Sequence, residues 1–221
     1  MTEVVVKFKG IELKGELVVP KNAKGKDAKG TVLFAYGAGS NRFSPRENFV
    51  AGKLNKEGFA TLLMDLLTPE EETIDDVTRE YRFNIPLLAE RLVGAVSWLK
   101  KNEYVKTHIK NNYIGLFGGS TGAAACLIAA AKLPKDVKAV VSRGGRPDLA
   151  MDYLSVVKTH VLLIVGGDDE PVIEMNQEAL AEMKCEAKLE IIKGATHLFE
   201  EPGKLEKVAD LAIMWFKEYL K

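Results

Sequence analysis

The sequence predicts an α/β fold with a mostly parallel, twisted sheet, in a single domain that covers residues 1–221. Two observations carry this prediction: short, fully apolar runs of strand length recur along the chain, and segments with helical periodicity separate them. Strands that helices cover on both faces are apolar throughout, whereas half-exposed strands alternate. Because crossovers between parallel strands are right-handed, we expect helices on both faces of the sheet.

The N-terminal segments differ from the rest. Val4–Phe8 and Ile11–Val19 alternate partially around Lys9–Gly10, which is typical of an antiparallel hairpin at a sheet edge. The segment Lys21–Gly30 is rich in Lys and Gly and predicts a solvated loop. After it we expect parallel strands at Thr31–Tyr36, Ala60–Met64, Tyr113–Phe117, Ala139–Ser142, Val161–Val165 and Leu189–Ile192.

Helical periodicity places helices between these strands, at about Pro45–Lys56, Ile85–Lys101, Thr121–Lys132, Ile173–Met183 and Leu205–Tyr219. In the second of them Leu88, Leu92 and Ala95 recur at three- and four-residue steps, so one apolar stripe faces the sheet. The acidic segment Leu66–Val77 is expected to be a solvated surface loop; the alternative is that it walls a site.

Composition excludes several classes of protein. The 31 basic residues balance 31 acidic ones, so the net charge excludes nonspecific electrostatic binding to nucleic acid or to an anionic membrane. No apolar run approaches the roughly 20 residues of a membrane-spanning helix, and the first residues do not resemble a signal peptide, so we expect a cytoplasmic protein. The two cysteines, Cys126 and Cys185, lie far apart without metal-ligand spacing, so we expect neither a disulfide nor a metal or cofactor.

A candidate nucleophile stands in Gly118–Gly122, which reads Gly-x-Ser-x-Gly between an apolar run and an alanine-rich helix. This is the pattern of a nucleophile elbow, in which Ser120 occupies a strained turn and the glycines allow a close approach of strand and helix. The helix start also aims backbone N–H groups at a substrate oxyanion. The alternative is an ordinary tight turn with an exposed serine, but the strand-to-helix context favours a nucleophile.

A serine nucleophile needs a base, and the chain has three histidines. His108 lies in a polar connection and is expected in a surface loop, while His160 opens a strand at its amino end. His197 follows the last predicted strand, where loops meet at the carboxyl edge of a parallel sheet. We therefore predict that His197 is the base.

An acid must orient the imidazole and stabilise its charged form. Asp168, Asp169 and Glu170 follow the strand that ends at Val165, so three carboxylates stand at a carboxyl end. One of them can instead cap the helix that opens near Pro171, and at least one is expected to be structural. The resulting chain order is Ser, Asp, His.

These motifs resemble the α/β-hydrolase superfamily, and more narrowly its dienelactone-hydrolase-like branch of short members with little or no cap domain. Four stretches carry the likeness, which extends over nearly the whole chain: Tyr36–Ser40, Gly118–Gly122, Gly166–Val172 and Gly194–Phe199.

The resemblance implies residue roles. The family's acid is the fourth residue of a Gly-Gly-x-Asp-x-Pro-Val segment, which is Asp169 here, and its oxyanion hole maps to the N–H groups of Ala38 and Thr121. Two departures stand out. Tyr36 replaces the usual His before the oxyanion loop; it either braces that loop through its hydroxyl or reaches into the pocket. Ser120 replaces the cysteine of dienelactone hydrolases proper.

The segment Ser142–Asp148 is similar to one in uncharacterised hydrolases of this branch, some of which carry a phosphoribosyltransferase domain; we expect no such domain here. Arg143 and Arg146 in this segment, and Arg42 elsewhere, have two interpretations of equal weight. They bind a substrate carboxylate in bidentate fashion, or they pair with acidic residues of neighbouring loops.

The sequence thus predicts a serine hydrolase that acts on a small-molecule ester, lactone or thioester through an acyl-enzyme. One alternative is an acyltransferase or lyase of the same fold, in which another nucleophile clears the intermediate. A second is an inactive binding protein that kept the fold. Neither the physiological substrate nor the oligomeric state follows from the sequence.

Overall fold

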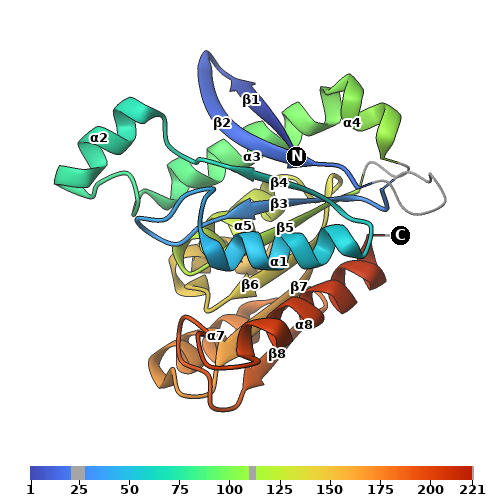
Figure 1. Ribbon diagram of the computed structural model, residues 1–221. Coiled ribbons are helices and arrows are strands. Elements are labelled where there is room, and N and C mark those ends of the chain that lie inside the picture. Colours follow the sequence, from blue (N-terminus) through green and yellow to red (C-terminus); the bar gives the residue numbers. More distant parts are fainter. Residues whose placement is uncertain (21–27, 110–112, 221) are drawn as a thin grey trace.

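The computed structural model describes residues 1–20, 28–109 and 113–220, which contain one eight-stranded sheet (Figure 1). Its order is β1-β2-β4-β3-β5-β6-β7-β8. The strands are β1 (Thr2–Phe8), β2 (Ile11–Val18), β3 (Thr31–Ala35), β4 (Ala60–Met64), β5 (Ile114–Gly119), β6 (Val137–Arg143), β7 (His160–Gly166) and β8 (Ala187–Ile192). Most of the predicted loop Lys21–Gly30 lies outside the described residues.

The sheet is parallel from β3 to β8, and an antiparallel hairpin forms one edge. β1 pairs with β2, and β2 pairs antiparallel with β4. Lys9 and Gly10 both have positive φ, +47° and +79°, the conformation that a two-residue hairpin turn requires. The predicted mostly parallel sheet with an N-terminal hairpin is confirmed.

Helices cover both faces of the sheet (Figure 1). On one face lie α1 (Pro45–Lys56) and α8 (Lys204–Tyr219), which pack against each other and enclose one apolar cluster. The second cluster lies under α3 (Ile85–Lys101), α4 (Glu103–His108), α5 (Thr121–Lys132), α6 (Met151–Leu154) and α7 (Glu170–Glu182), with a 3₁₀ turn at Pro147–Ala150. The first and last residues predicted for α1, α3 and α5 are the same as those in the structure.

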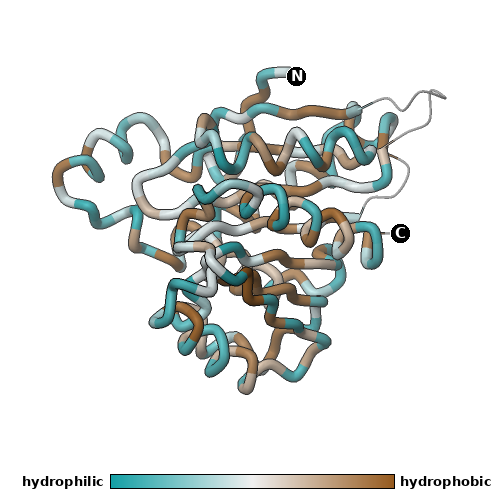
Figure 2. The backbone as a smooth tube through the Cα atoms, turned by 60° about the horizontal axis from the view of Figure 1, so that its bottom comes forward, coloured by the Kyte–Doolittle hydropathy of each residue, from teal (hydrophilic) through white to brown (hydrophobic). Residues whose placement is uncertain are grey.

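Burial explains why the parallel strands lack alternation. All residues of β3, β4 and β5 are buried, whereas the edge strand β1 is mostly exposed. Figure 2 shows the hydrophobic residues concentrated in the central strands, with mixed colours along the surrounding helices. Burying apolar side chains on both faces is the main favourable contribution to folding, so these strands form the core that positions the loops at their carboxyl ends.

Two expectations about surface segments were wrong. The acidic segment Leu66–Val77 is not a loop: Pro69–Thr78 forms α2, which Thr68 and Glu71 start with a reciprocal capping box. His108 is the last residue of α4 rather than part of a loop. Among the helices of the described residues, none combines the length and the apolar character needed to cross a membrane.

Candidate active site

The turn between β5 and α5 has the geometry of a nucleophile elbow. Ser120 has φ +49° and ψ −121°, a region that side-chain-bearing residues rarely adopt. A Cβ at Gly118 would lie 2.5 Å from the Ala123 Cα, and one at Gly122 would lie 2.5 Å from the Tyr36 carbonyl oxygen. The two flanking glycines are therefore required by backbone contact, and the turn holds Ser120 at the carboxyl edge of the sheet.

Two backbone segments converge on Ser120 as an oxyanion hole requires. Thr121 is the first residue of α5, so its N–H has no carbonyl partner within the helix. The loop after β3 approaches from the other side: a Cβ at Gly37 would lie 3.0 Å from the Ser120 Cβ. Ala38 is the next residue of that loop, inside a turn that the Ser40 N–H closes on the Gly37 carbonyl at 3.1 Å.

His197 and Asp169 form a direct pair, with 2.7 Å between the His197 Nδ1 and the Asp169 Oδ2. Asp169 stands at the N-cap position of α7, but its side chain makes no capping hydrogen bond. Its carboxylate is therefore available to the imidazole. Asp168 is exposed, and its N–H donates to the Ala195 carbonyl at 3.0 Å. The structure thus places Asp169, and not Asp168, against the imidazole.

One segment after β6 touches both Ser120 and His197. The Ser120 N–H donates to the Arg143 carbonyl at 3.2 Å, and the Arg146 N–H donates to the Ser120 carbonyl at 3.1 Å. Between them Gly144 has φ +51°, and a Cβ there would lie 3.4 Å from both the Cε1 and the Nδ1 of His197. This segment therefore fixes the nucleophile turn and the imidazole relative to each other.

The other two histidines lie elsewhere. His160 is the first residue of β7, at the amino end of the strand, where its ring stacks on Tyr219 with centroids 4.0 Å apart. His108 stacks on Tyr104 at 4.2 Å. Neither reaches the carboxyl edge, so His197 is the histidine that the fold brings to Ser120's side of the sheet.

Arg143 is buried in an ion pair with Glu47 of α1, and the Ser44 hydroxyl also donates to the Glu47 carboxylate. Their side chains are 5% and 2% exposed, which leaves no surface for a substrate. A Cβ at Gly119 would lie 2.6 Å from the Arg143 Nη2 and 2.9 Å from the Glu47 Oε1. This pair therefore packs directly beneath the residue that precedes the nucleophile, a role that the sequence analysis did not foresee.

The other two arginines are also paired. Arg42 contacts Asp65, which follows β4, and Arg146 contacts Asp148 through two hydrogen bonds of 2.8 and 2.7 Å. Pairing with neighbouring acidic residues, the second interpretation from the sequence, is therefore what the structure shows at all three arginines.

Tyr36 is buried, with 2% of its surface exposed, and its hydroxyl has no hydrogen-bond partner within the described part of the chain. Burial, together with the negative charges of Asp65 and Glu47, raises the pKa of Tyr36 well above its ordinary value. The hydroxyl therefore stays neutral and keeps its proton. It does not brace the oxyanion loop through a hydrogen bond to any described residue.

A cavity of about 220 Å³ adjoins the oxyanion loop. Its lining comes from the loop after β3, the end of β4 and the segment that contains α2: Tyr36, Gly37, Ala38, Gly39, Ser40, Asn41, Asp65, Leu66, Leu67, Glu72, Asp75, Asp76, Arg82 and Leu88. Most residues of the acidic segment are exposed, as expected of solvated surface, and the segment also forms a wall of this cavity, which was the alternative. Neither Ser120 nor His197 belongs to the lining, but Ser120 packs against the lining residue Gly37.

An eight-stranded sheet of this order, with a nucleophile elbow after β5 and a His–Asp pair on later loops, defines an α/β-hydrolase fold. More narrowly, the chain belongs to the dienelactone hydrolase family, whose family model matches residues 13–220.

Two solved structures show the extent of the likeness. The crystal structure of a dienelactone hydrolase from Anabaena variabilis ATCC 29413 is 54% identical, with a TM-score of 0.93 over 100% of this chain and 98% of that one. Est1E from Butyrivibrio proteoclasticus, with bound ferulic acid, is 19% identical with a TM-score of 0.80 over 98% and 99% of the two chains, and supports the fold alone.

The curated relatives are longer proteins. Rv0571c of Mycobacterium tuberculosis H37Rv, which carries the provisional name phosphoribosyl transferase, is 48% identical over 218 residues. The match covers 99% of this chain and 46% of that protein, so the chain spans about half the length of the curated relatives that it matches.

Proposed function

We propose that this protein is a serine hydrolase that cleaves a small ester, lactone or thioester through an acyl-enzyme. The observation that carries the proposal is the 2.7 Å contact between His197 and Asp169 at the edge of the sheet where the elbow presents Ser120. A serine hydroxyl is a weak nucleophile at neutral pH, and a base oriented by a carboxylate is the arrangement that activates it.

In the proposed reaction Ser120 Oγ attacks the acyl carbon, and His197 Nε2 accepts the serine proton. The carboxylate of Asp169 holds the imidazole in the tautomer with Nδ1 protonated and stabilises its charged form. The N–H groups of Ala38 and Thr121 bind the oxyanion. The imidazolium then protonates the leaving oxygen or sulfur. Water, deprotonated by His197, attacks the acyl-enzyme and releases the acid and the free serine.

Two features favour hydrolysis over the alternatives. The family and the Anabaena variabilis relative are both named for a lactone hydrolase, although this chain has Ser120 where dienelactone hydrolases proper use cysteine. The name phosphoribosyl transferase belongs to relatives of which this chain matches only 46%, and the match covers 99% of this chain, including its elbow.

Intact-mass spectrometry after incubation with a fluorophosphonate tests the proposal. We expect one adduct on the parent protein and none on Ser120→Ala. The matched control is Ser155→Ala, an exposed serine after α6, which should label like the parent. Absence of labelling under conditions that modify a reference serine hydrolase would contradict the proposal and favour the alternative of an inactive binding protein.

A second assay separates hydrolysis from acyl transfer. The acyl-enzyme formed from a p-nitrophenyl ester should turn over in buffer and release free acid. If instead the acyl-enzyme persisted until an alcohol, thiol or amine acceptor was added, the protein would be an acyltransferase.

A further inference from the structure

The segment after β6 lies at the centre of the proposed triad. The Arg143 carbonyl accepts the Ser120 N–H, and the Arg146 N–H donates to the Ser120 carbonyl. The ring and the backbone carbonyl of His197 both come within 3.4 Å of the place that a Cβ at Gly144 would take. The position of this segment therefore sets where Ser120 lies relative to His197, so the contacts that hold the segment bear on the reaction.

One buried side chain of α7 holds this segment. Asn176 is 0% exposed, and its Nδ2 donates to the Gly145 carbonyl at 3.0 Å and to the Val172 carbonyl at 2.7 Å. Gly145 has little room to move, because a Cβ there would lie 1.9 Å from the Ser142 Oγ and 2.7 Å from the Ala123 Cβ. The Gly145 backbone thus packs against the end of β6 and against α5, while its carbonyl is held by α7.

The same helix carries the acid of the proposed triad. Asp169 is the N-cap residue of α7, and the N–H groups of Val172 and Ile173 donate to the Asp169 carbonyl at 3.0 Å each. Asn176 follows Asp169 by about two helical turns, so both residues lie on the same side of the helix. Asn176 therefore joins the helix that begins at the acid to the segment that contacts the nucleophile and the base.

Folding stability alone does not account for a polar side chain at position 176. The Asn176 Oδ1 is buried and has no hydrogen-bond partner among the described residues, a cost that an apolar side chain of the same shape would avoid. α7 also packs on β7 and β8. Such packing is non-directional, whereas a hydrogen bond fixes its acceptor in both distance and angle. The contact to Gly145 therefore supplies a precision that the packing of α7 does not.

We propose that Asn176 is a positioning residue, which fixes the segment 143–146 against α7 and so keeps the Asp169–His197 pair aligned with Ser120. The inference rests on the proposed function, because it takes these three residues as the triad. Asn176 is fully buried, so it touches no substrate and acts through the backbone of the segment. Its loss should slow the chemical step and leave substrate binding unchanged.

The test measures steady-state hydrolysis of a p-nitrophenyl ester and the rate constant of fluorophosphonate labelling at Ser120. Asn176→Leu keeps the approximate size of the side chain and removes both hydrogen bonds. Both kcat and the labelling rate constant should fall about tenfold, while KM changes by less than about twofold. A misplacement of 1 Å costs about a hundredfold, and the Gly144 N–H, which donates to the Ile164 carbonyl at 2.8 Å, limits the shift to less than that.

A second variant removes only the contact to the segment. A serine hydroxyl within a helix donates to the carbonyl four residues earlier, so Asn176→Ser keeps a donor for Val172 and leaves Gly145 without one. It should show the same loss, and it carries the comparison if Asn176→Leu does not fold. The matched control is Asn55 of α1, whose Nδ2 also donates two hydrogen bonds, but at the amino end of β4. Asn55→Leu and Asn55→Ser should react like the parent protein.

Combination with Asp169→Asn separates positioning from a general structural defect. If Asn176 acts through the acid–base pair, Asn176→Leu should cost less than about twofold once Asp169→Asn has already broken that pair, because both changes act on one step. A defect spread through the fold would cost the same factor in both backgrounds, and that result would overturn the proposal.

The remaining outcomes separate this proposal from the proposed function. If both Asn176 variants were labelled as fast as the Asn55 variants, the positioning role would be refuted, while the activated Ser120 would stand. If the parent protein were not labelled under conditions that modify a reference hydrolase, the proposed function would fail, and the inference would fail with it.

Discussion

The buried ion pair between Glu47 and Arg143 should be the most sensitive charged contact near the site. Glu47→Gln keeps the shape of the side chain but removes the negative charge, so Arg143 remains buried and uncompensated. Breaking one partner of such a pair costs about 3–5 kcal/mol. The side chains of Arg143 and Glu47 are 5% and 2% exposed, so this is a buried ion pair rather than a surface pair.

Urea unfolding gives the measurement. With a slope of roughly 2–3 kcal/mol per M, a loss of this size lowers the midpoint by about 1–2.5 M. The matched control is Glu57→Gln, which removes an ion pair to Lys217 at the other end of α1, where both side chains are more than 40% exposed. Exposed pairs contribute about 0–1 kcal/mol, so this midpoint should move by less than about 0.5 M.

A double variant tests the physical cause. Replacing both Glu47 and Arg143 by Met removes both charges, so it should cost less than Glu47→Gln alone, because no isolated charge stays buried. Since Gly119 packs on this pair, the fluorophosphonate should also label Glu47→Gln more slowly than Glu57→Gln. If Glu47→Gln unfolded at the same urea concentration as the control, the reasoning from burial would be refuted.

Three further predictions follow from the site. Asp169→Asn should lower kcat for ester hydrolysis by about three to four orders of magnitude and Asp168→Asn by less than about threefold; the reverse order would make Asp168 the acid. Gly144 has φ +51°, and a Cβ added there would lie 3.4 Å from the His197 ring, so Gly144→Ala should lower kcat about tenfold with little change in KM. An unchanged kcat would show that the imidazole has room to shift. Burial would raise the pKa of Asp75, but hydrogen bonds from the next loop outweigh it and hold the pKa below its ordinary value. Its stabilisation is therefore complete above the unfolded pKa of about 3.9 and is lost as pH falls through the lower folded pKa. Urea unfolding of Asp75→Asn should show a deficit at pH 7 that shrinks at pH 3, and an equal deficit at both would contradict this sign.

Local signals predicted the elements that pack on the sheet. α1 begins with Pro45 at its first position, and α3 begins after Asn84, whose side chain accepts the Leu87 N–H at 3.1 Å. The elbow could also be predicted from the sequence, because Gly118 and Gly122 occupy positions where any Cβ would meet backbone atoms. The helix caps and the contact of Gly118 with Ala123 lie within a few positions of each other, whereas Gly122 meets the backbone of Ala35 and Tyr36, so its glycine was predicted from the motif alone.

Long-range pairs could not be predicted in this way. Glu47 lies in the first turn of a helix, where an acidic residue is usually a favourable surface charge, and its partner Arg143 is 96 residues away. The choice between Asp168 and Asp169 was similar. Spacing from the strand left both open, and the family resemblance favoured Asp169, whose carboxylate lies against His197. Such choices depend on side-chain directions that a linear pattern does not contain.

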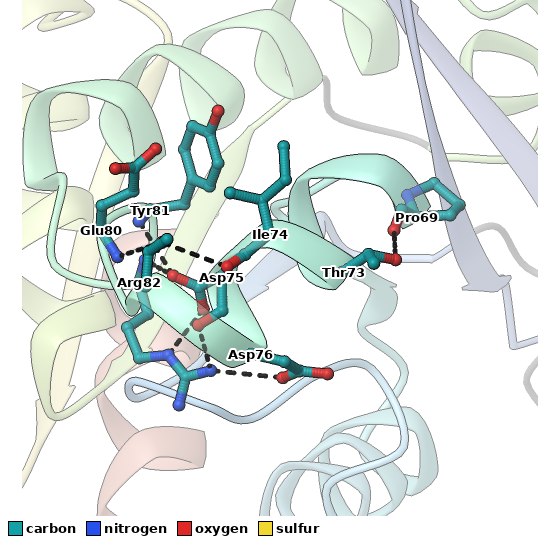
Figure 3. A network of polar contacts seen from close by, with 9 residues as sticks. Pro69, Thr73, Ile74, Asp75, Asp76, Glu80, Tyr81 and Arg82 are labelled. Carbon is teal, nitrogen blue, oxygen red and sulfur yellow. Dashed lines mark hydrogen bonds and ion pairs between the residues drawn. The ribbon is translucent and has the colours of Figure 1, made fainter.

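The segment that walls the cavity shows where this limit matters most. α2 has one buried residue, and that residue is Asp75, so the helix has no apolar stripe from which periodicity could predict it. Figure 1 shows it projecting from the sheet. Polar contacts to Arg82 and Tyr81 position it instead of core packing (Figure 3). Substitutions at the exposed positions of α2 should therefore alter the cavity without disturbing the core.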